Sequence, residues 1–93
     1  MSIEITHIRL SGSIRQHEYI THLRWKNEND GSTGDSTKAT LVDWIDNKKG
    51  VAHVGSGSVQ VNVGTVHPDG GTPYLRTYAD GKWTNNLLSL PEF

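Results

Sequence analysis

The sequence contains one strand-like hexapeptide twice, ITHIRL at residues 5–10 and ITHLRW at residues 20–25, and this repeat constrains the fold more than any other feature. Each copy carries Thr-His-x-Arg among Ile, Leu and Trp, and the polar sequence SGSIRQH lies between the copies. Isoleucine-rich segments separated by turn-forming residues are typical of paired strands. We therefore expect residues 3–10 and 18–26 to form a β-hairpin.

One hairpin register brings both copies of the repeat into phase. In this register His7 lies opposite His22 outside the core, and Arg9 and Arg24 lie diagonal to them on the same face. The threonines then face inward, and a slip of one residue would turn the histidines and arginines toward the core. On the second strand the expected core-facing residues are Tyr19, Thr21, Leu23 and Trp25.

The clustered side chains of His7, Arg9, His22 and Arg24 leave two interpretations open. Guanidinium and imidazole groups donate hydrogen bonds to phosphate and carboxylate, so this face fits an anion site with few carboxylates nearby to neutralise it. The pattern favours the simpler interpretation, which is the solvated face of an amphipathic hairpin. A metal site is not expected, because the chain has no cysteine and offers no clear third ligand beside the two histidines.

The middle of the chain predicts a loop followed by a helix. Residues 27–36, NENDGSTGDS, are polar and contain two glycines, which is typical of a flexible loop. Asp35 or Ser36 can then cap a helix over residues 37–48, and Gly50 is expected to end it in the left-handed conformation. The apolar stripe of this helix consists of Leu41, Val42, Trp44 and Ile45.

Three more strands are expected after the helix, over residues 51–54, 59–63 and 73–78, because valine-rich or aromatic segments alternate there with turn sequences. The order ββαβββ predicts an α+β fold. We expect a small curved antiparallel sheet with one helix packed on it, in a single domain over residues 1–93.

The C-terminal sequence NNLLSLPEF is too apolar for a free end, so Leu87, Leu88 and Leu90 are expected to be buried. A chain of 93 residues of which 33% are hydrophobic has a thin core. Covering apolar surface with a second copy would supplement it, so we expect a homo-oligomer.

Charge and hydropathy exclude several classes of protein. Nine basic and ten acidic residues give a net charge of −1, so a nucleic-acid partner is not expected. The apolar runs are too short for a membrane span. The first residues, MSIEITHIRL, lack the basic and apolar regions of a signal peptide, and we expect a cytoplasmic protein.

The stretch PYLRTYADGKWTNNLLSLPEF, residues 73–93, resembles the ending of a family of short bacterial and phage domains of unknown function, domain-of-unknown-function family 3892. This chain departs from the family pattern at Asn85 and in the local sequence GKW. The resemblance implies that family's fold and a bacterial or mobile-element setting, in which small proteins often act by binding and blocking. The matching residues are Tyr74, Arg76, Thr77, Asp80, Gly81, Asn86, Leu87, Leu88, Leu90 and Pro91.

Two side chains of this region join the candidate site. Arg76 is expected to reach Asp80 or the carbonyl groups of the C-terminal segment. Trp83 is expected to be either an exposed stacking residue or a clamp on that segment.

These observations predict a small non-catalytic binding domain that acts through a sheet face or edge on a protein partner or on a second copy, as a phage or mobile-element accessory or inhibitor protein would. The alternative is a small-ligand binder that sequesters a phosphate-bearing or nucleotide-like anion. No enzymatic activity, cofactor or metal is expected, because no Ser-His-Asp order or paired carboxylate stands out. The candidate ligand-binding residues are His7, Arg9, His22, Arg24, Arg76 and Trp83.

Overall fold

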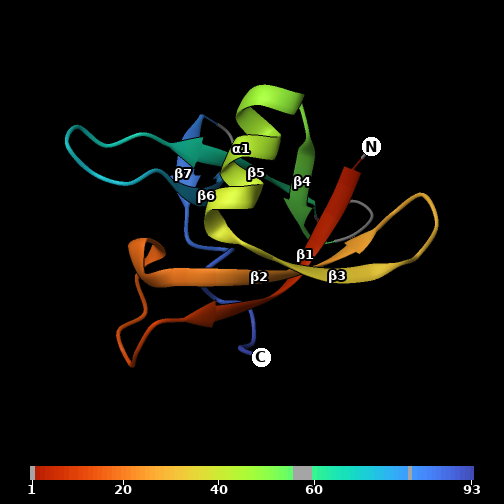
Figure 1. Ribbon diagram of the computed structural model, residues 1–93, viewed down its shortest axis with the longest axis horizontal. Coiled ribbons are helices and arrows are strands. Elements are labelled where there is room, and N and C mark those ends of the chain that lie inside the picture. Colours follow the sequence, from red (N-terminus) through yellow and green to blue (C-terminus); the bar gives the residue numbers. More distant parts are fainter. Residues whose placement is uncertain (1, 56–59, 80) are drawn as a thin grey trace.

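The computed structural model describes residues 2–55, 60–79 and 81–93, and within them one α-helix lies against a single open sheet (Figure 1). The seven described strands have the order β3-β2-β1-β4-β5-β6-β7. This arrangement confirms the predicted α+β class. The elements are β1 (Ser2–Leu10), the 3-10 turn η1 (His17–Tyr19), β2 (Ile20–Asn27), β3 (Thr33–Thr37), α1 (Lys38–Lys48), β4 (Val51–Val54), β5 (Val61–Val66), β6 (Tyr74–Ala79) and β7 (Lys82–Thr84).

The central strand β1 pairs with two neighbours of opposite orientation. It is antiparallel to β2 and parallel to β4 through Ser2–Glu4. The sheet is therefore mixed rather than purely antiparallel, which corrects one detail of the expected fold. Parallel neighbours need a crossover connection, and the chain from β1 to β4 makes it through β2, β3 and α1.

The hairpin of β1 and β2 forms as predicted, but its register differs. His7 lies opposite Arg24 and Arg9 lies opposite His22, so the prediction that His7 faces His22 was wrong. The ladder is interrupted at two positions, because Thr6 of β1 and Thr21 of β2 have no partner in the facing strand, and His7–Arg24 and Arg9–His22 lie between these two irregularities. An unpaired residue shifts every later pair by one position.

The unpaired Thr6 also changes which positions of β1 face the core. The odd-numbered Ile5 is buried before it, and the even-numbered Ile8 is buried after it. In β2, Leu23 is buried as predicted. Tyr19 is exposed because it belongs to η1, and Ile20 is buried instead. The remaining predicted core-facing residues are partly buried, and they are Thr21 and Trp25.

All of strand β3 except Thr37 forms within the segment that was predicted to be a flexible loop, residues 27–36. It pairs with β2, which places Asp35 beside Arg24. The hydroxyl of Ser36 accepts a hydrogen bond from the indole Nε1 of Trp25 at 3.0 Å. These partners from a distant segment outweigh the weak strand propensity of the glycine- and serine-containing sequence.

Helix α1 begins one residue later than predicted and is capped by Thr37. The Thr37 hydroxyl accepts a hydrogen bond from the backbone N–H of Thr40 at 3.2 Å. Lys49, with φ of 56°, takes the left-handed position that was expected of Gly50. Gly50 is required for a different reason, because a Cβ there would lie 2.2 Å from the ring of Trp44.

The strands after the helix agree with the prediction apart from their bounds. β4 matches residues 51–54, and β6 matches residues 73–78 to within one residue. β5 begins at Val61 and continues to Val66, while residue 59 of the predicted strand lies outside the described residues. The short edge strand β7, which pairs with β6, was not predicted.

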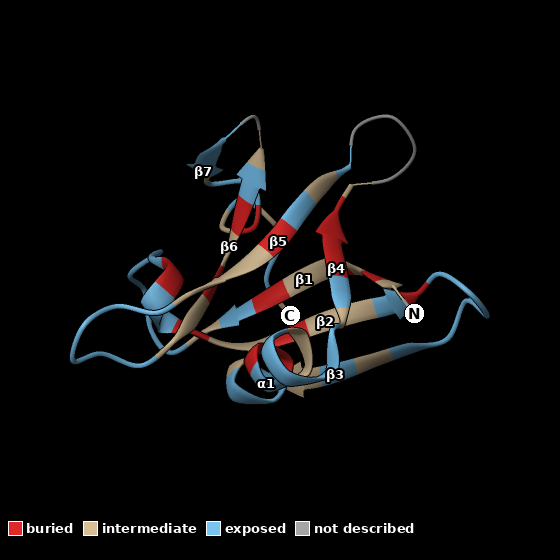
Figure 2. Ribbon diagram, turned by 90° about the horizontal axis from the view of Figure 1, so that it is seen from above, coloured by how far each residue is buried: buried red, intermediate tan, exposed pale blue. Residues whose placement is uncertain are grey.

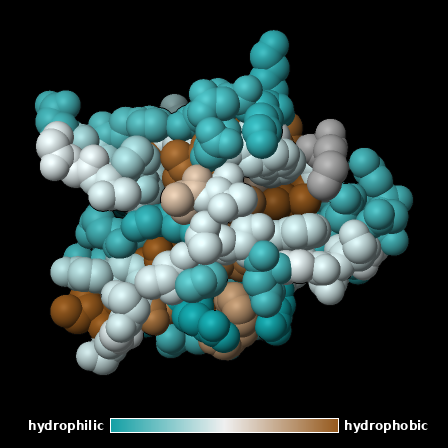
Figure 3. Space-filling view, in the orientation of Figure 1, coloured by the Kyte–Doolittle hydropathy of each residue, from teal (hydrophilic) through white to brown (hydrophobic). Residues whose placement is uncertain are grey.

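One core cluster joins side chains from α1, five strands and the C-terminal segment, and Figure 2 shows these buried positions along the strands and the helix. Leu87 is completely buried, whereas Leu88 and Leu90 are partly buried against the core, so the prediction for this segment holds fully for Leu87 alone. On the face seen in Figure 3, hydrophobic atoms form small separate patches among hydrophilic ones. Among the described residues, no helix has the length and hydrophobicity that a membrane span requires.

Candidate functional site

The four side chains predicted at the hairpin, His7, Arg9, His22 and Arg24, lie on one face of the sheet, which we call the His/Arg face. Directly paired residues of two strands project to the same side, so the pairs His7–Arg24 and Arg9–His22 define a common face. The observed register therefore brings the four residues together, although their partners differ from those predicted.

The repeated threonine links the two copies of Thr-His-x-Arg. The Thr6 hydroxyl donates a hydrogen bond to the backbone carbonyl of Arg24 at 3.2 Å. In the same way, the Thr21 hydroxyl donates to the carbonyl of Arg9 at 3.2 Å. Each copy of the repeat is thus tied to the arginine backbone of the other copy, which holds the two arginines in register.

The same hydroxyl groups orient the two histidines. Nδ1 of His7 lies 2.9 Å from the Thr6 hydroxyl, and Nδ1 of His22 lies 3.0 Å from that of Thr21. Because each hydroxyl proton is donated to a carbonyl, its oxygen is left to accept a hydrogen bond from Nδ1–H. The Nε2 atom of each ring is then the one left to interact with a ligand.

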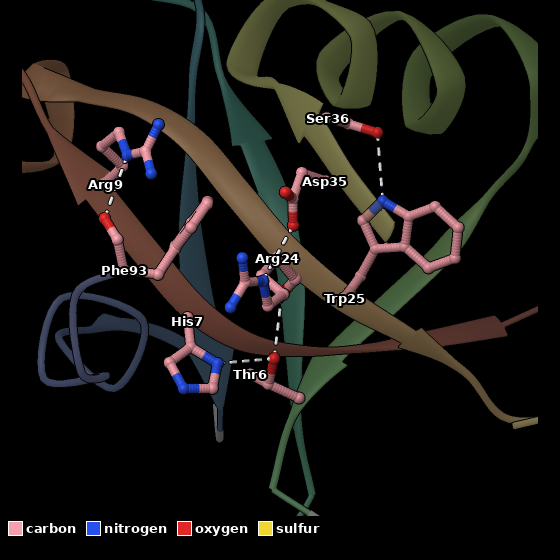
Figure 4. Close-up of polar contacts among 8 residues, drawn as sticks. All are labelled: Thr6, His7, Arg9, Arg24, Trp25, Asp35, Ser36 and Phe93. Atoms are coloured by element: carbon pink, nitrogen blue, oxygen red, sulfur yellow. Dashed lines mark hydrogen bonds and ion pairs between the residues drawn. The ribbon is translucent and has the colours of Figure 1, made fainter. Parts of the chain in front are cut away.

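The ring of Phe93 lies between the two arginines of this face (Figure 4). The guanidinium carbon is 4.5 Å from the ring centroid for Arg9 and 4.3 Å for Arg24. His7 meets the same ring edge-on, with the two ring centroids 6.4 Å apart. Both guanidinium groups are within the range of about 6 Å for cation–π attraction. Phe93 was not among the residues predicted for this site, because its only signal in the sequence was the apolar character of the C-terminal segment.

The backbone before Phe93 runs parallel to β1 beside Ile8. Ile8 N–H donates to the carbonyl of Pro91 at 3.0 Å, and Phe93 N–H donates to the carbonyl of Ile8 at 3.1 Å. Arg9 Nε donates to the Phe93 carbonyl at 2.9 Å. Since β4 pairs with β1 at Ser2–Glu4, the C-terminal segment covers a part of the β1 edge beyond β4.

Arg15, in the connection between β1 and β2, holds the same segment from a second side. Its guanidinium donates to the carbonyl oxygens of Leu88 and Leu90 and forms an ion pair with Glu92 at 3.1 Å. The segment from Pro91 to Phe93 is therefore held by contacts with Arg9 and Arg15 as well as by hydrogen bonds to the β1 backbone.

Asp35 of β3 partly neutralises the His/Arg face. Its carboxylate accepts a hydrogen bond from Arg24 Nε at 2.9 Å. This hydrogen bond is the main cause that lowers the pKa of the Asp35 carboxyl below its ordinary value, and the positive charges of Arg24, Arg9 and His22 contribute in the same direction. The strand β3 brings this one carboxylate from a segment that was predicted to be a loop.

Arg76 and Trp83 lie apart from the His/Arg face, on the β6–β7 side of the sheet. Arg76 donates to the carbonyl of Thr84 at 3.1 Å and to the side-chain oxygen of Asn85 at 3.0 Å. It thus reaches β7 and the side chain of Asn85 rather than the backbone carbonyls predicted for the C-terminal segment, and Asp80 lies outside the described residues. Trp83 is 43% exposed and packs edge-on against Tyr78, at a centroid distance of 5.1 Å.

The chemistry available at the His/Arg face is that of binding through positive charge and hydrogen-bond donors. None of the ion pairs among the described residues involves Arg9. Its guanidinium contacts the Phe93 ring and donates a hydrogen bond from Nε to the Phe93 carbonyl. In the same part of the chain, no three His, Asp or Glu side chains lie close enough together to hold a metal ion.

A family model described as a protein of unknown function (DUF3892) matches residues 4–91. The matched range includes all four residues of the His/Arg face and ends before Phe93. Searches of curated proteins and of solved structures found no match.

Proposed function

We propose a function for a chain that belongs to the DUF3892 family of unknown function, as its C-terminal sequence predicted. The domain is a non-catalytic binding protein, which holds a peptide segment of a protein partner on the His/Arg face. The observation that carries this proposal is the position of the Phe93 ring between the guanidinium groups of Arg9 and Arg24. The face already accommodates one peptide segment, which the chain itself supplies.

The contacts of that segment define the chemistry of the partner. An extended backbone fits beside Ile8, where the β1 edge donates and accepts one hydrogen bond each. An aromatic side chain fits between the two arginines, and an acidic side chain just before it can pair with Arg15, as Glu92 does. The proposed partner segment is therefore extended and contains an acidic residue followed by an aromatic one.

A second copy of the chain offers a segment of this kind, so self-association by exchange of residues 91–93 is one form of the proposed binding. With a net charge of −1, the domain has no strongly basic field that would favour nucleic acid. We place it in the cytoplasm, where it would act as an accessory or inhibitor protein of a phage or mobile element by occupying its partner.

The test compares the parent chain with Phe93→Ala, which empties the space between the arginines without shortening the chain. A fluorescein-labelled peptide with the sequence LSLPEF, that of residues 88–93, is titrated with each protein and followed by anisotropy. We expect the variant to bind the peptide more tightly than the parent does, because Phe93 of the parent competes with the peptide for the same position.

Two further variants decide whether the arginines are responsible. Arg24→Ala added to Phe93→Ala should weaken peptide binding roughly five- to tenfold, the loss expected for about 1 kcal/mol of cation–π attraction. Lys26→Ala, which removes the same charge from the same strand, should leave binding nearly unchanged. Absence of peptide binding by Phe93→Ala, or equal losses in the two charge variants, would contradict the proposal.

A second candidate function is the capture of a phosphate-bearing or nucleotide-like anion. It is favoured by the guanidinium group of Arg9, which forms no ion pair among the described residues. Titration of the parent with AMP and with inorganic phosphate should then show saturable binding, because the guanidinium of Arg9 donates charge-assisted hydrogen bonds to phosphate oxygens. Equal binding by the parent and Arg9→Ala would remove this candidate.

A further inference from the structure

A cavity of about 190 Å³ lies on the side of the hairpin opposite the His/Arg face, between α1 and the strands β1, β2 and β3. Trp25 follows Arg24 in β2 and therefore projects to the other side of the sheet, toward α1, as Figure 4 shows. Trp25 and Trp44 line this cavity together with the buried side chains of Ile3 and Leu41. We call it the indole pocket.

Two glycines hold the indole rings in place. Gly34 is the partner of Trp25 in β3, and a Cβ at Gly34 would lie 2.7 Å from the Trp25 ring. A Cβ at Gly50 would lie 2.2 Å from the ring of Trp44. Each indole therefore packs directly on backbone, and the Trp25 ring is fixed further by its hydrogen bond to Ser36. Walls that are fixed before a ligand arrives lower the entropic cost of binding it.

The size of the cavity limits what can occupy it. An engineered apolar cavity of about 150 Å³ binds benzene, so a space of this order holds a molecule of one or two fused rings. Indole walls favour an aromatic ring, through stacked or edge-on contacts. The space is too small for several side chains of a partner surface, and this argues for a small molecule.

The polar groups at the rim indicate which substituent the ring carries. Asp43 lies at the rim, and its Oδ1 accepts a hydrogen bond from Asn47 at 2.7 Å. Its Oδ2 forms an exposed ion pair with Lys48 at 3.9 Å, a distance that is too long for a hydrogen bond. Asp43 Oδ2 is thus available to accept a hydrogen bond from a ligand.

We propose that the indole pocket binds a small planar aromatic molecule of one or two rings that carries an N–H donor directed at Asp43. This site is independent of the proposed peptide binding, since it lies on the other face of the sheet. Failure of one proposal would therefore leave the other unaffected.

The test is a titration of the ¹⁵N-labelled full chain with unlabelled indole, followed by NMR. The three tryptophans, Trp25, Trp44 and Trp83, provide three indole N–H signals, which single Trp→Phe variants assign. We expect saturable shifts of the Trp25 and Trp44 signals with a dissociation constant on the order of 0.1–1 mM, as for a ligand of this size. The Trp83 signal should not move. Equal shifts of all three signals, or no saturable shift, would overturn the proposal.

Two comparisons test the details. Indole should bind several-fold more tightly than 1-methylindole, which lacks the donor, and Asp43→Ala should abolish this preference. Thr40→Phe places a ring at the rim of the pocket and should block the binding of indole. Thr40→Val keeps a side chain of the size of threonine and should leave indole binding unchanged. Equal binding by the two Thr40 variants, or a preference that survives in Asp43→Ala, would show that the ligand binds elsewhere or without the proposed hydrogen bond.

Discussion

The guanidinium carbon of Arg24 lies 4.3 Å from the ring centroid of Phe93. The same guanidinium donates through Nε to Asp35, so one arginine joins the second strand to the third strand and to the C-terminal segment. Arg9 contacts the Phe93 ring as well and also bonds to its carbonyl. The His/Arg face is therefore a contact surface within the chain and not merely a solvated side of the hairpin.

Phe93→Ala should lower the free energy of unfolding by about 1–2 kcal/mol, because each of two partly exposed cation–π contacts contributes about 0.5–1 kcal/mol. Phe93→Leu keeps apolar contact and loses only the cation–π attraction, so it should have a smaller effect. Urea denaturation of the three proteins measures the difference. If both substitutions are neutral, the arginines do not hold Phe93 in solution.

Leu87→Ala should cost about 2–5 kcal/mol, since the side chain is completely buried and its removal leaves a cavity. Leu88→Ala is the matched control and should cost clearly less, because Leu88 is only partly buried. Deletion of residues 86–93 should destabilise the domain by several kcal/mol, given the contribution of a buried leucine. If thermal melts show a larger loss of stability for Leu88→Ala than for Leu87→Ala, the C-terminal segment packs differently.

The domain should lose stability as pH falls below about 6.5, in part because of His17. Burial lowers the pKa of His17 below the ordinary value of 6.5, and the charge of Arg76 lowers it further, while Glu18 opposes the shift. The unfolded chain then binds the His17 proton at a higher pH than the folded chain does. The free energy of unfolding therefore decreases as pH falls from about 6.5 toward the pKa in the folded state.

His17→Phe tests this pH dependence, because it removes the titrating group and keeps a ring against Tyr74, which stacks on His17. The free energy of unfolding at pH 7.5 and at pH 5.5 should differ less in the variant than in the parent. Asp30 and Asp35 have lowered pKa values and titrate below this window, so they do not account for the slope. An identical slope in both proteins would show that His17 does not cause it.

Gly50→Ala should destabilise the domain by about 1–3 kcal/mol, the range for forcing extra volume into a packed site, because its Cβ would lie 2.2 Å from the Trp44 ring. Gly12→Ala is the control, since nothing lies within 4 Å of the position of its Cβ. A shift in tryptophan fluorescence should accompany the change at Gly50 only. Equal melting temperatures for Gly50→Ala and the parent would mean that Trp44 does not pack on this glycine.

The chain should self-associate at tens of micromolar, an order of magnitude typical of weak association. The open sheet leaves β3 and β7 as edges, and the exposed Tyr78 and Trp83 lie at the β7 edge. Sedimentation velocity of Trp83→Ala and Phe93→Ala separates association through this edge from exchange of the C-terminal segment. A parent that sediments only as a monomer would remove the expectation.

Local features of the sequence determined the secondary structure on which the site rests. Strand-forming residues at 3–10 and 18–26 and the stripe from Leu41 to Ile45 predict a hairpin and a helix, because alternation and helical periodicity are properties of each segment alone. Within each copy of Thr-His-x-Arg, the histidine and the arginine share a face for the same reason, since residues two apart on a strand project to one side. The family was likewise predicted from C-terminal residues that lie close together in the chain, and a family match over residues 4–91 confirms it.

Only the tertiary structure decided the register at Thr6, the pairing of the third strand, and the position of Phe93. Each depends on contacts between segments far apart in the chain, and the local sequence is compatible with other outcomes. A polar segment such as TGDST forms a strand when Arg24 and Trp25 supply partners for Asp35 and Ser36. Phe93 reaches the arginines because β4 leaves the β1 edge open beside Ile8, which no local pattern in either segment encodes.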